Sequence, residues 1–105
     1  MKPLEGTFKA ILVTNGRKTG KEHAVELKAV FYDNKFYFSR RNPQSDWLKN
    51  VLANPQVKIQ YNDTMFFGIA LLVTDENLRK KISHLKYSDK RAQESRIVLE
   101  VTLCE

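Results

Sequence analysis

The chain has 105 residues, of which 42% are hydrophobic and 10% aromatic, with one cysteine, two histidines and a net charge of +6. This composition predicts one ordered domain over residues 1–105 and leaves too few cysteines and histidines for a closed structural zinc site, so no metal centre is expected. We expect a cytoplasmic protein without a membrane span, because the sequence has no long apolar run, no export signal and no cysteine pair. The positive net charge favours an anionic partner, either nucleic acid or a phosphorylated small molecule.

Two-residue alternation dominates the first 40 residues and predicts three strands. The first strand begins near Phe8 and is apolar on both faces. A cleaner alternation predicts a half-buried strand over 22–32. Asp33-Asn34 then supplies turn residues that tolerate the left-handed conformation, and a short aromatic strand over 35–39 completes a hairpin.

Helical spacing replaces this alternation twice in the rest of the chain. Trp47, Leu48, Val51 and Leu52 are predicted to share one helical face, which indicates a helix over 45–53 that Asn54-Pro55 ends. The later predicted elements are a strand over 57–61, a strand over 64–73 with apolar residues on both faces, a helix opened by Thr74 and continuing to Leu85, a polar connection over 86–95, and a last strand over 97–103.

These six strands and two short helices predict a mainly β protein. The hairpin connections imply antiparallel pairing, and a six-stranded sheet protects its edges best by closing on itself. We therefore expect a six-stranded antiparallel barrel whose open ends are plugged by the helices.

A glycine-flanked basic turn lies between the first two predicted strands. Its residues are Asn-Gly-Arg-Lys-Thr-Gly-Lys, from Asn15 to Lys21. Two cations and a hydroxyl between two glycines are suited to holding a phosphate. The turn is not a Walker loop, because it has three residues between its glycines and Glu22 after the lysine. From the residues alone it is either a phosphate cradle or a solvated basic turn.

Two segments resemble a known family when they are taken together. Leu12 to Lys21 (LVTNGRKTGK) and Trp47 to Val57 (WLKNVLANPQV) are similar to the deazaflavin-dependent nitroreductases. That family belongs to the flavin-binding split β-barrels, which include the pyridoxamine-phosphate oxidases. The resemblance covers about residues 8–74 and returns at Arg96-Ile97. It implies a six-stranded split β-barrel that binds coenzyme F-420, with FMN as the second choice and haem as a third possibility from sister members.

The resemblance also implies which residues bind the coenzyme. By position these are two cations and a hydroxyl on the turn for the phosphate, a histidine just after it, a cation near the coenzyme tail, and two helix residues beside the coenzyme: Arg17, Lys18, Thr19, His23, Arg40, Trp47 and Asn50. The residues themselves leave alternatives open. Trp47 fits equally well as the core anchor of its helix, and Asn50 as a solvated residue. His84 is expected at the surface or in packing, and Cys104 in packing.

The implied activity is that of an oxidoreductase. Reduced coenzyme would pass hydride to a small electron-poor acceptor, such as a quinone, an enone or a nitro compound, and this chemistry needs no catalytic side chain. The sequence departs from the family in a loop between Arg40 and Trp47 that is about two residues shorter, and in a short 85–96 segment whose paired tyrosines are reduced to Tyr87. Coenzyme binding is therefore better supported than nitroreductase activity itself.

Other functions and assemblies remain open at this point. A homodimer is expected, since the strand over 64–73 is apolar on both faces and split barrels of this size often pair. A non-catalytic flavin-binding protein is one alternative, and a basic nucleic-acid-binding barrel is another. Phe36 and Phe38 fit the buried set, which argues against a base-stacking surface. The basic turn accounts for one concentration of charge, whereas the basic segment over 79–91 is not explained by the family.

Overall fold

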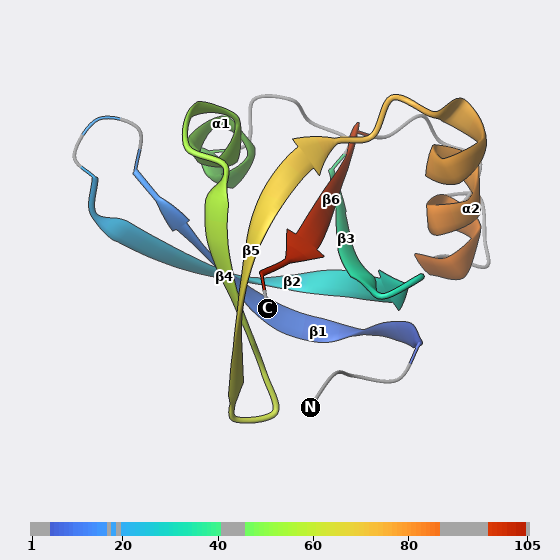
Figure 1. Ribbon diagram of the computed structural model, residues 1–105, viewed down its shortest axis with the longest axis horizontal. Coiled ribbons are helices and arrows are strands. Elements are labelled where there is room, and N and C mark those ends of the chain that lie inside the picture. Colours follow the sequence, from blue (N-terminus) through green and yellow to red (C-terminus); the bar gives the residue numbers. More distant parts are fainter. Residues whose placement is uncertain (1–4, 17, 19, 41–45, 87–96, 105) are drawn as a thin grey trace.

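In a computed structural model, the described residues are 5–16, 18, 20–40, 46–86 and 97–104. They form a closed antiparallel barrel with the strand order β1-β2-β3-β6-β5-β4 (Figure 1). The elements in chain order are β1 (Gly6–Asn15), β2 (Glu22–Tyr32), β3 (Lys35–Arg40), α1 (Asp46–Ala53), β4 (Gln56–Tyr61), β5 (Thr64–Leu72), α2 (Glu76–Lys86) and β6 (Ile97–Leu103). The predicted mainly β, six-stranded antiparallel barrel with two short helices is confirmed.

The barrel closes where β1 pairs with β4, with Leu12 opposite Ile59. The last strand, β6, lies between β3 and β5 and pairs with both. Each strand therefore has two hydrogen-bonded neighbours, although β2 pairs with β3 only over residues 30–32 and β1 pairs with β4 only over residues 11–13. Neither of the helices that the structure describes is long and apolar enough to cross a membrane.

Two hairpin turns have the backbone that their residues favour. Asp33 and Asn34 have φ of 51° and 68°, and Asn62 and Asp63 have φ of 49° and 61°. Consecutive left-handed residues are typical of type I′ turns, whose twist matches that of the paired strands. The predicted turn at Asp33-Asn34 is confirmed, and it fixes the register of β2 against β3.

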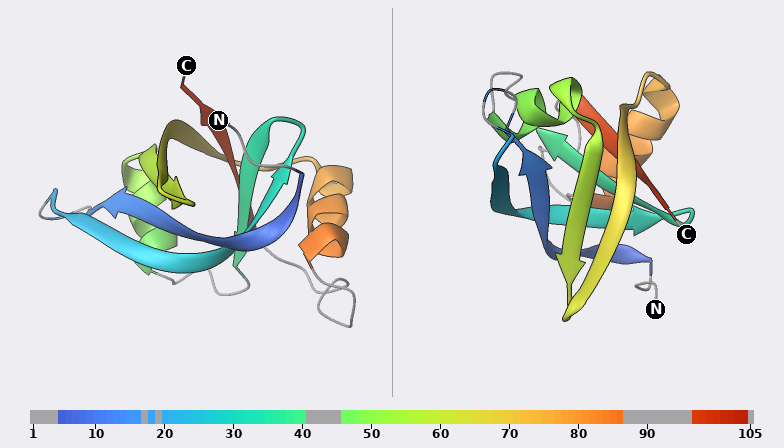
Figure 2. Two further views of the ribbon diagram at one scale, coloured as in Figure 1. Left: turned by 90° about the horizontal axis from the view of Figure 1, so that it is seen from below. Right: turned by 60° about the vertical axis from the view of Figure 1, so that its left-hand side comes forward.

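The main core lies inside the barrel, and α1 closes one end of it (Figure 2). Phe36 and Phe38 are fully buried there, as expected. From α1, Trp47, Leu48 and Val51 pack into the same cluster of apolar side chains. The prediction that Leu52 shares this face is wrong: Leu52 is exposed, because the helix turns its Asn50 side toward the barrel. The prediction of a helical plug is confirmed for α1, which contacts β1 and β5.

The second helix, α2, covers a smaller core on the outside of the barrel, where Ile82 packs with Val30, Tyr37 and Val98. The helix was expected to open at Thr74, but its cap is Asp75, whose Oδ1 accepts hydrogen bonds from the backbone N–H groups of residues 77 and 78.

The end of α2 differs from the prediction in one respect. Lys86 was expected in a polar connection, but it is the last helical residue and is buried. Its Nζ donates a hydrogen bond of 2.9 Å to Ser39 Oγ, which ties the end of α2 to β3. A positive charge in the last helical turn also suits the helix dipole.

Tyr37 gives the fold a predicted sensitivity to alkaline pH. Its hydroxyl donates to Glu100 Oε2 at 3.2 Å, and burial together with the Glu100 carboxylate raises the pKa of Tyr37 above its ordinary value of 10.0. The unfolded chain then ionises Tyr37 before the folded chain does. We expect the free energy of unfolding to fall as pH rises above 10, by at most about 1.4 kcal/mol per pH unit.

Chemical denaturation of the wild type and of Tyr37→Phe at several pH values tests this expectation. At neutral pH the variant should be somewhat less stable than the wild type, because the hydrogen bond to Glu100 is absent. Above pH 10 its free energy of unfolding should fall less steeply, because it has no Tyr37 hydroxyl to ionise. Identical pH slopes for the two proteins would contradict the account.

Candidate functional site

The β1–β2 hairpin passes beside α1 at one end of the molecule, and its tip projects beyond the helix (Figures 1 and 2). The hairpin carries the basic turn, and α1 carries two further predicted site residues, Trp47 and Asn50. The fold thus brings together two segments about thirty residues apart in the sequence. We refer to this region as the hairpin–α1 end.

The basic turn is held closed by its own backbone. Gly16 N–H donates to the Lys21 carbonyl at 2.7 Å, and Gly20 N–H donates to the Gly16 carbonyl at 2.9 Å. Gly20 has φ of 73°, a left-handed conformation that favours glycine. Both glycine N–H groups are used within the turn and are therefore not available to an anion. Lys18 is exposed there, whereas Arg17 and Thr19 lie outside the described residues.

The strand register places His23 on the inner face of the hairpin. His23 pairs with Thr14, and the next pair on the same face is Val25 with Leu12. Leu12 and Thr14 are buried, whereas His23 is exposed. This face therefore runs from the barrel core out to the exposed imidazole. Thr14 is a residue that the sequence analysis missed, although it continues the alternation of Ala10 and Leu12.

On α1, both predicted residues are buried. Trp47 is 9% exposed and packs in the barrel core, so the interpretation as a core anchor is confirmed. Asn50 is 6% exposed, so the interpretation as a solvated residue is wrong. The error arose because the helix was considered alone, whereas its position over the barrel end also covers its more polar side.

The predicted residue Arg40 is placed by its backbone only. It ends β3 and pairs with Ile97 at the start of β6. The structure therefore brings four of the predicted residues to the hairpin–α1 end, namely Lys18, His23, Trp47 and Asn50. Among the residues that the structure describes, no three His, Cys, Asp or Glu side chains form a group that could hold a metal ion.

Among the described residues of this end, two buried polar atoms have no hydrogen-bond partner. They are Thr14 Oγ1 and the indole Nε1 of Trp47. A buried polar group without a partner costs about 1–3 kcal/mol of stability. A ligand with polar groups would offset this cost, and the exposed ammonium of Lys18 would suit a phosphate on the same ligand. The residues present therefore fit a phosphorylated organic coenzyme.

A pocket of about 190 Å³ lies on the opposite, outer face of the sheet. Val13, Lys58 and Phe67 are neighbours in register across β1, β4 and β5 and form its floor. Lys58 forms an ion pair with Glu22 at its edge. Coenzyme-sized ligands usually occupy roughly 300–1,000 Å³, so this pocket alone is too small for one.

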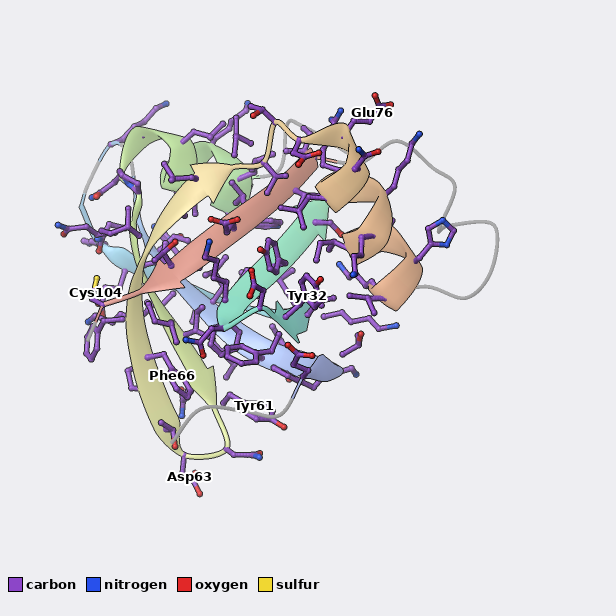
Figure 3. The ribbon with its side chains drawn as sticks, turned by 45° about the vertical axis from the view of Figure 1, so that its right-hand side comes forward. Tyr32, Tyr61, Asp63, Phe66, Glu76 and Cys104 are labelled. Atoms are coloured by element: carbon purple, nitrogen blue, oxygen red, sulfur yellow. The ribbon has the colours of Figure 1, made fainter. Side chains whose placement is uncertain are left out.

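Cys104 also lines this pocket, at the end of β6 (Figure 3). It is exposed, so the expectation that it is a packing residue is wrong. Its backbone N–H still donates to the Phe67 carbonyl at 2.8 Å, which extends the pairing of β5 with the segment after β6.

An apolar ridge runs along the outer face of β5 beside the pocket. It consists of Met65, Phe67, Ile69 and Leu71, of which Phe67 is 53% and Leu71 60% exposed. The intervening residues face the barrel interior, as Phe66 does against Phe36. The expectation that this strand is apolar on both faces is confirmed. Large apolar patches on a surface typically mark sites of association.

A family profile described as F420H(2)-dependent quinone reductase matches residues 1–102. No curated protein matches the chain.

Solved structures share the fold at low sequence identity. One is described as an F420-H2 dependent reductase (23% identity, 89% of this chain and 92% of that chain, TM-score 0.70). A second is a protein from Listeria innocua provisionally assigned as a pyridoxamine 5'-phosphate oxidase (16% identity, 92% and 84%, TM-score 0.78). A third is described as a domain-swapped dimer (24% identity, 89% and 78%, TM-score 0.73). These similarities confirm the split β-barrel.

Proposed function

The chain belongs to the F420H(2)-dependent quinone reductase family, and we propose that it binds coenzyme F-420 at the hairpin–α1 end and reduces a quinone. It is accordingly an oxidoreductase that uses F-420, as the resemblance implied. The family match over residues 1–102 is the observation that carries this conclusion. The position of the coenzyme and the identity of the acceptor are the parts that we propose.

The proposed binding residues divide by their chemistry. Lys18 stands in an exposed turn where it can form charge-assisted hydrogen bonds to the coenzyme phosphate. Arg17 and Thr19 belong to the same proposed phosphate group, by resemblance. His23 extends the inner face of the hairpin, and Trp47 and Asn50 line the α1 side. Arg40 is proposed to contact the coenzyme tail, also by resemblance.

The reaction that we propose is the two-electron reduction of a quinone. The reduced coenzyme, when bound, supplies the hydride, and the quinone takes up that hydride and one proton to leave as the hydroquinone. The protein binds the coenzyme, orients it and keeps water from the reacting atoms. A quinone is favoured over an enone or a nitro compound because the family is described as a quinone reductase.

An anaerobic assay of reduced F-420 with a soluble quinone tests this function. We expect oxidised coenzyme to form only when protein and quinone are both present. Tight coenzyme binding without oxidation by any of the three acceptor classes would instead favour the non-catalytic flavin-binding alternative.

We also propose that the chain forms a homodimer through the apolar ridge on β5. The ridge is bordered by Lys58 and Gln60 on β4 and by Thr102 on β6, so an apolar strip has a polar margin. Stable interfaces share this arrangement of an apolar centre and a polar rim. A solved structure of the same fold is described as a domain-swapped dimer, which supports association of two chains.

Leu71→Asp is expected to dissociate this dimer. A carboxylate on the ridge, next to Glu100 on β6, would have to be desolvated beside a like charge, which we expect to weaken association at least tenfold. Sedimentation analysis across a range of protein concentrations would measure the change. The matched control is Leu85→Asp, since Leu85 is an exposed leucine on α2 away from the ridge.

The outcomes of this experiment are distinct. A dimer in the wild type and in the Leu85 variant, but not in the Leu71 variant, supports the proposed interface. A wild-type species of 12.2 kDa at all concentrations would contradict it. Cys104 offers a second readout, because it is the single cysteine and lies beside Phe67. Its reaction with a thiol reagent should slow as the protein concentration rises.

A further inference from the structure

The pocket on the outer face of the sheet is not explained by the proposed coenzyme site. Its volume of about 190 Å³ suits something smaller than a coenzyme. Its walls are mainly apolar and include Val13, Phe67 and Ile69. At its edge, Lys58 and Glu22 neutralise each other in an ion pair. The pocket is therefore suited to an uncharged apolar group about the size of one side chain.

The apolar ridge beside this pocket is too small to hold two chains together by itself. Its most exposed members, Met65, Phe67 and Leu71, are 42%, 53% and 60% exposed. If a fully exposed side chain of this size presents roughly 200 Å², these three side chains expose roughly 300 Å². A stable interface buries about 800 Å² on each chain. The proposed dimer interface must therefore extend beyond the ridge.

The surface on the β4 side of the ridge is the better continuation of the interface. On that side the pocket follows directly, because Phe67 is paired with Lys58, which is paired with Val13. On the other side, Leu71 is paired with Glu100 of β6. The Glu100 carboxylate forms an ion pair with Lys35 at 3.3 Å, and such a charged group suits the margin of an interface. The interface is thus expected to cover the pocket.

The ridge also supplies a side chain that fits the pocket. Phe67 and Ile69 are part of the pocket wall, whereas Leu71 lies outside it. Leu71 is the most exposed large apolar side chain among the residues that the structure describes. Strand β5 rises about 13 Å from Phe67 to Leu71. The point midway between the pocket and Leu71 therefore lies near Ile69.

We propose that the two chains of the dimer pack face to face through this side of the sheet, with Leu71 of each chain in the pocket of the other. A two-fold axis that runs across the strands near Ile69 exchanges the two positions, so one such contact implies the second. The two β5 strands then run antiparallel, as in the aligned packing of two sheets. This inference rests on the proposed homodimer and adds the alignment of its chains and the group that fills the pocket.

Val13→Phe tests this arrangement, because the larger side chain fills the pocket without adding a charge. Val13 lies on the outer face, so the separate chain has room for the ring, but the ring excludes the partner's Leu71. We expect the dissociation constant of the dimer to rise by about 10- to 100-fold, as for overpacking at two symmetric contacts. The matched control is Ile11→Phe. Ile11 lies two residues away on the same face of β1 and does not line the pocket, so this variant should dimerise like the wild type.

Leu71→Ala removes the side chain that enters the pocket and should also weaken the dimer, by about tenfold. An equimolar mixture of Leu71→Ala and Val13→Phe should recover association. In the mixed dimer, the intact Leu71 of one chain meets an open pocket, and the filled pocket meets the shortened side chain. We therefore expect the mixture to form dimers more tightly than either variant alone, as measured by sedimentation analysis over a range of concentrations.

The outcomes separate this inference from the dimer itself. If the wild type is monomeric at every concentration, the proposed homodimer fails, and the arrangement fails with it. If the wild type dimerises and Val13→Phe dimerises equally well, or if the mixture shows no recovery, the dimer stands but Leu71 does not occupy the pocket. Loss of the dimer in Ile11→Phe would place the contact at the Met65 end of the ridge and would also overturn the inference.

Discussion

Replacing Trp47 by alanine is expected to lower the free energy of unfolding by about 3–5 kcal/mol, as for other buried aromatic residues. Trp47 is buried where α1 closes the barrel, and it packs with the core side chains of several strands. A domain of this size is stable by only about 5–15 kcal/mol, so the variant would be partly unfolded at moderate temperature. Chemical denaturation followed by far-UV circular dichroism measures the loss.

Leu52→Ala on the same helix is the control for this prediction. Leu52 is exposed, so its loss should cost less than about 1 kcal/mol. Comparable losses for Leu52→Ala and Trp47→Ala would contradict the placement of α1 over the core. Because Trp47→Ala disturbs the whole barrel end, its effect on coenzyme binding would not identify a contact.

Reversing the charge of Lys18 is expected to weaken F-420 binding by roughly 10- to 100-fold at low salt, the usual range for a hydrogen bond to a charged group. Lys18 is exposed on the turn, so its interaction with phosphate is open to screening. The effect of Lys18→Glu should therefore shrink as the ionic strength rises. Titration of the coenzyme at two salt concentrations measures both quantities.

Lys80→Glu controls for the change in net charge. Lys80 lies on α2 and forms an i,i+4 pair with Glu76 at 3.9 Å, away from the hairpin. The substitution alters the net charge by the same amount and should leave coenzyme affinity within twofold of the wild type. Equal effects of the two substitutions would mean that the coenzyme responds to overall charge and that the turn has no specific role.

The basic segment on α2 has local partners in the structure. Lys81 lies over the ring of Tyr32, with Nζ 4.7 Å from the ring centroid, and Lys80 is near Glu76. Phe36 and Phe38 are buried and cannot stack on nucleic acid bases. These observations favour a solvated helix face with local contacts over a nucleic-acid-binding surface.

Local sequence signals were sufficient for the elements and their pairing type. The alternation in β2 and the left-handed turn at Asp33-Asn34 specify a hairpin without information from the rest of the chain. The position of β6 between β3 and β5 could not be read in this way. It depends on which strands meet when the sheet curls and closes, which is a property of the whole chain.

Burial was harder to predict wherever tertiary packing decides it. Asn50 looks solvated on a helical projection, but it is buried because α1 lies across the barrel end. Cys104 seemed to continue the alternation of β6, but that strand ends at Leu103 and leaves the thiol exposed. Thr14 went unnoticed because a buried hydroxyl within an apolar strand has no distinctive pattern.

The residues of the candidate site were predicted mainly from the resemblance to a known family and less from the pattern of residues in the sequence. Spacing alone could not show that the basic turn and α1 lie at the same end, because the segments between them form two further strands. The structure brings Lys18, His23, Trp47 and Asn50 to that end. The roles of Arg17, Thr19 and Arg40 stay predictions, as do the single domain, the cytoplasmic location and the effect of the reduction to Tyr87, which lies outside the described residues.

The central claim is that F-420 binds beside α1, and the chain contains its own reporter for this. Trp47 is the only tryptophan, and it borders the proposed site. Titrating the wild-type protein with F-420, with FMN and a single-stranded oligonucleotide in parallel, should give saturable quenching of Trp47 emission by F-420, with one equivalent per chain. No saturable change with F-420, combined with oligonucleotide binding that falls steeply with salt, would contradict the account.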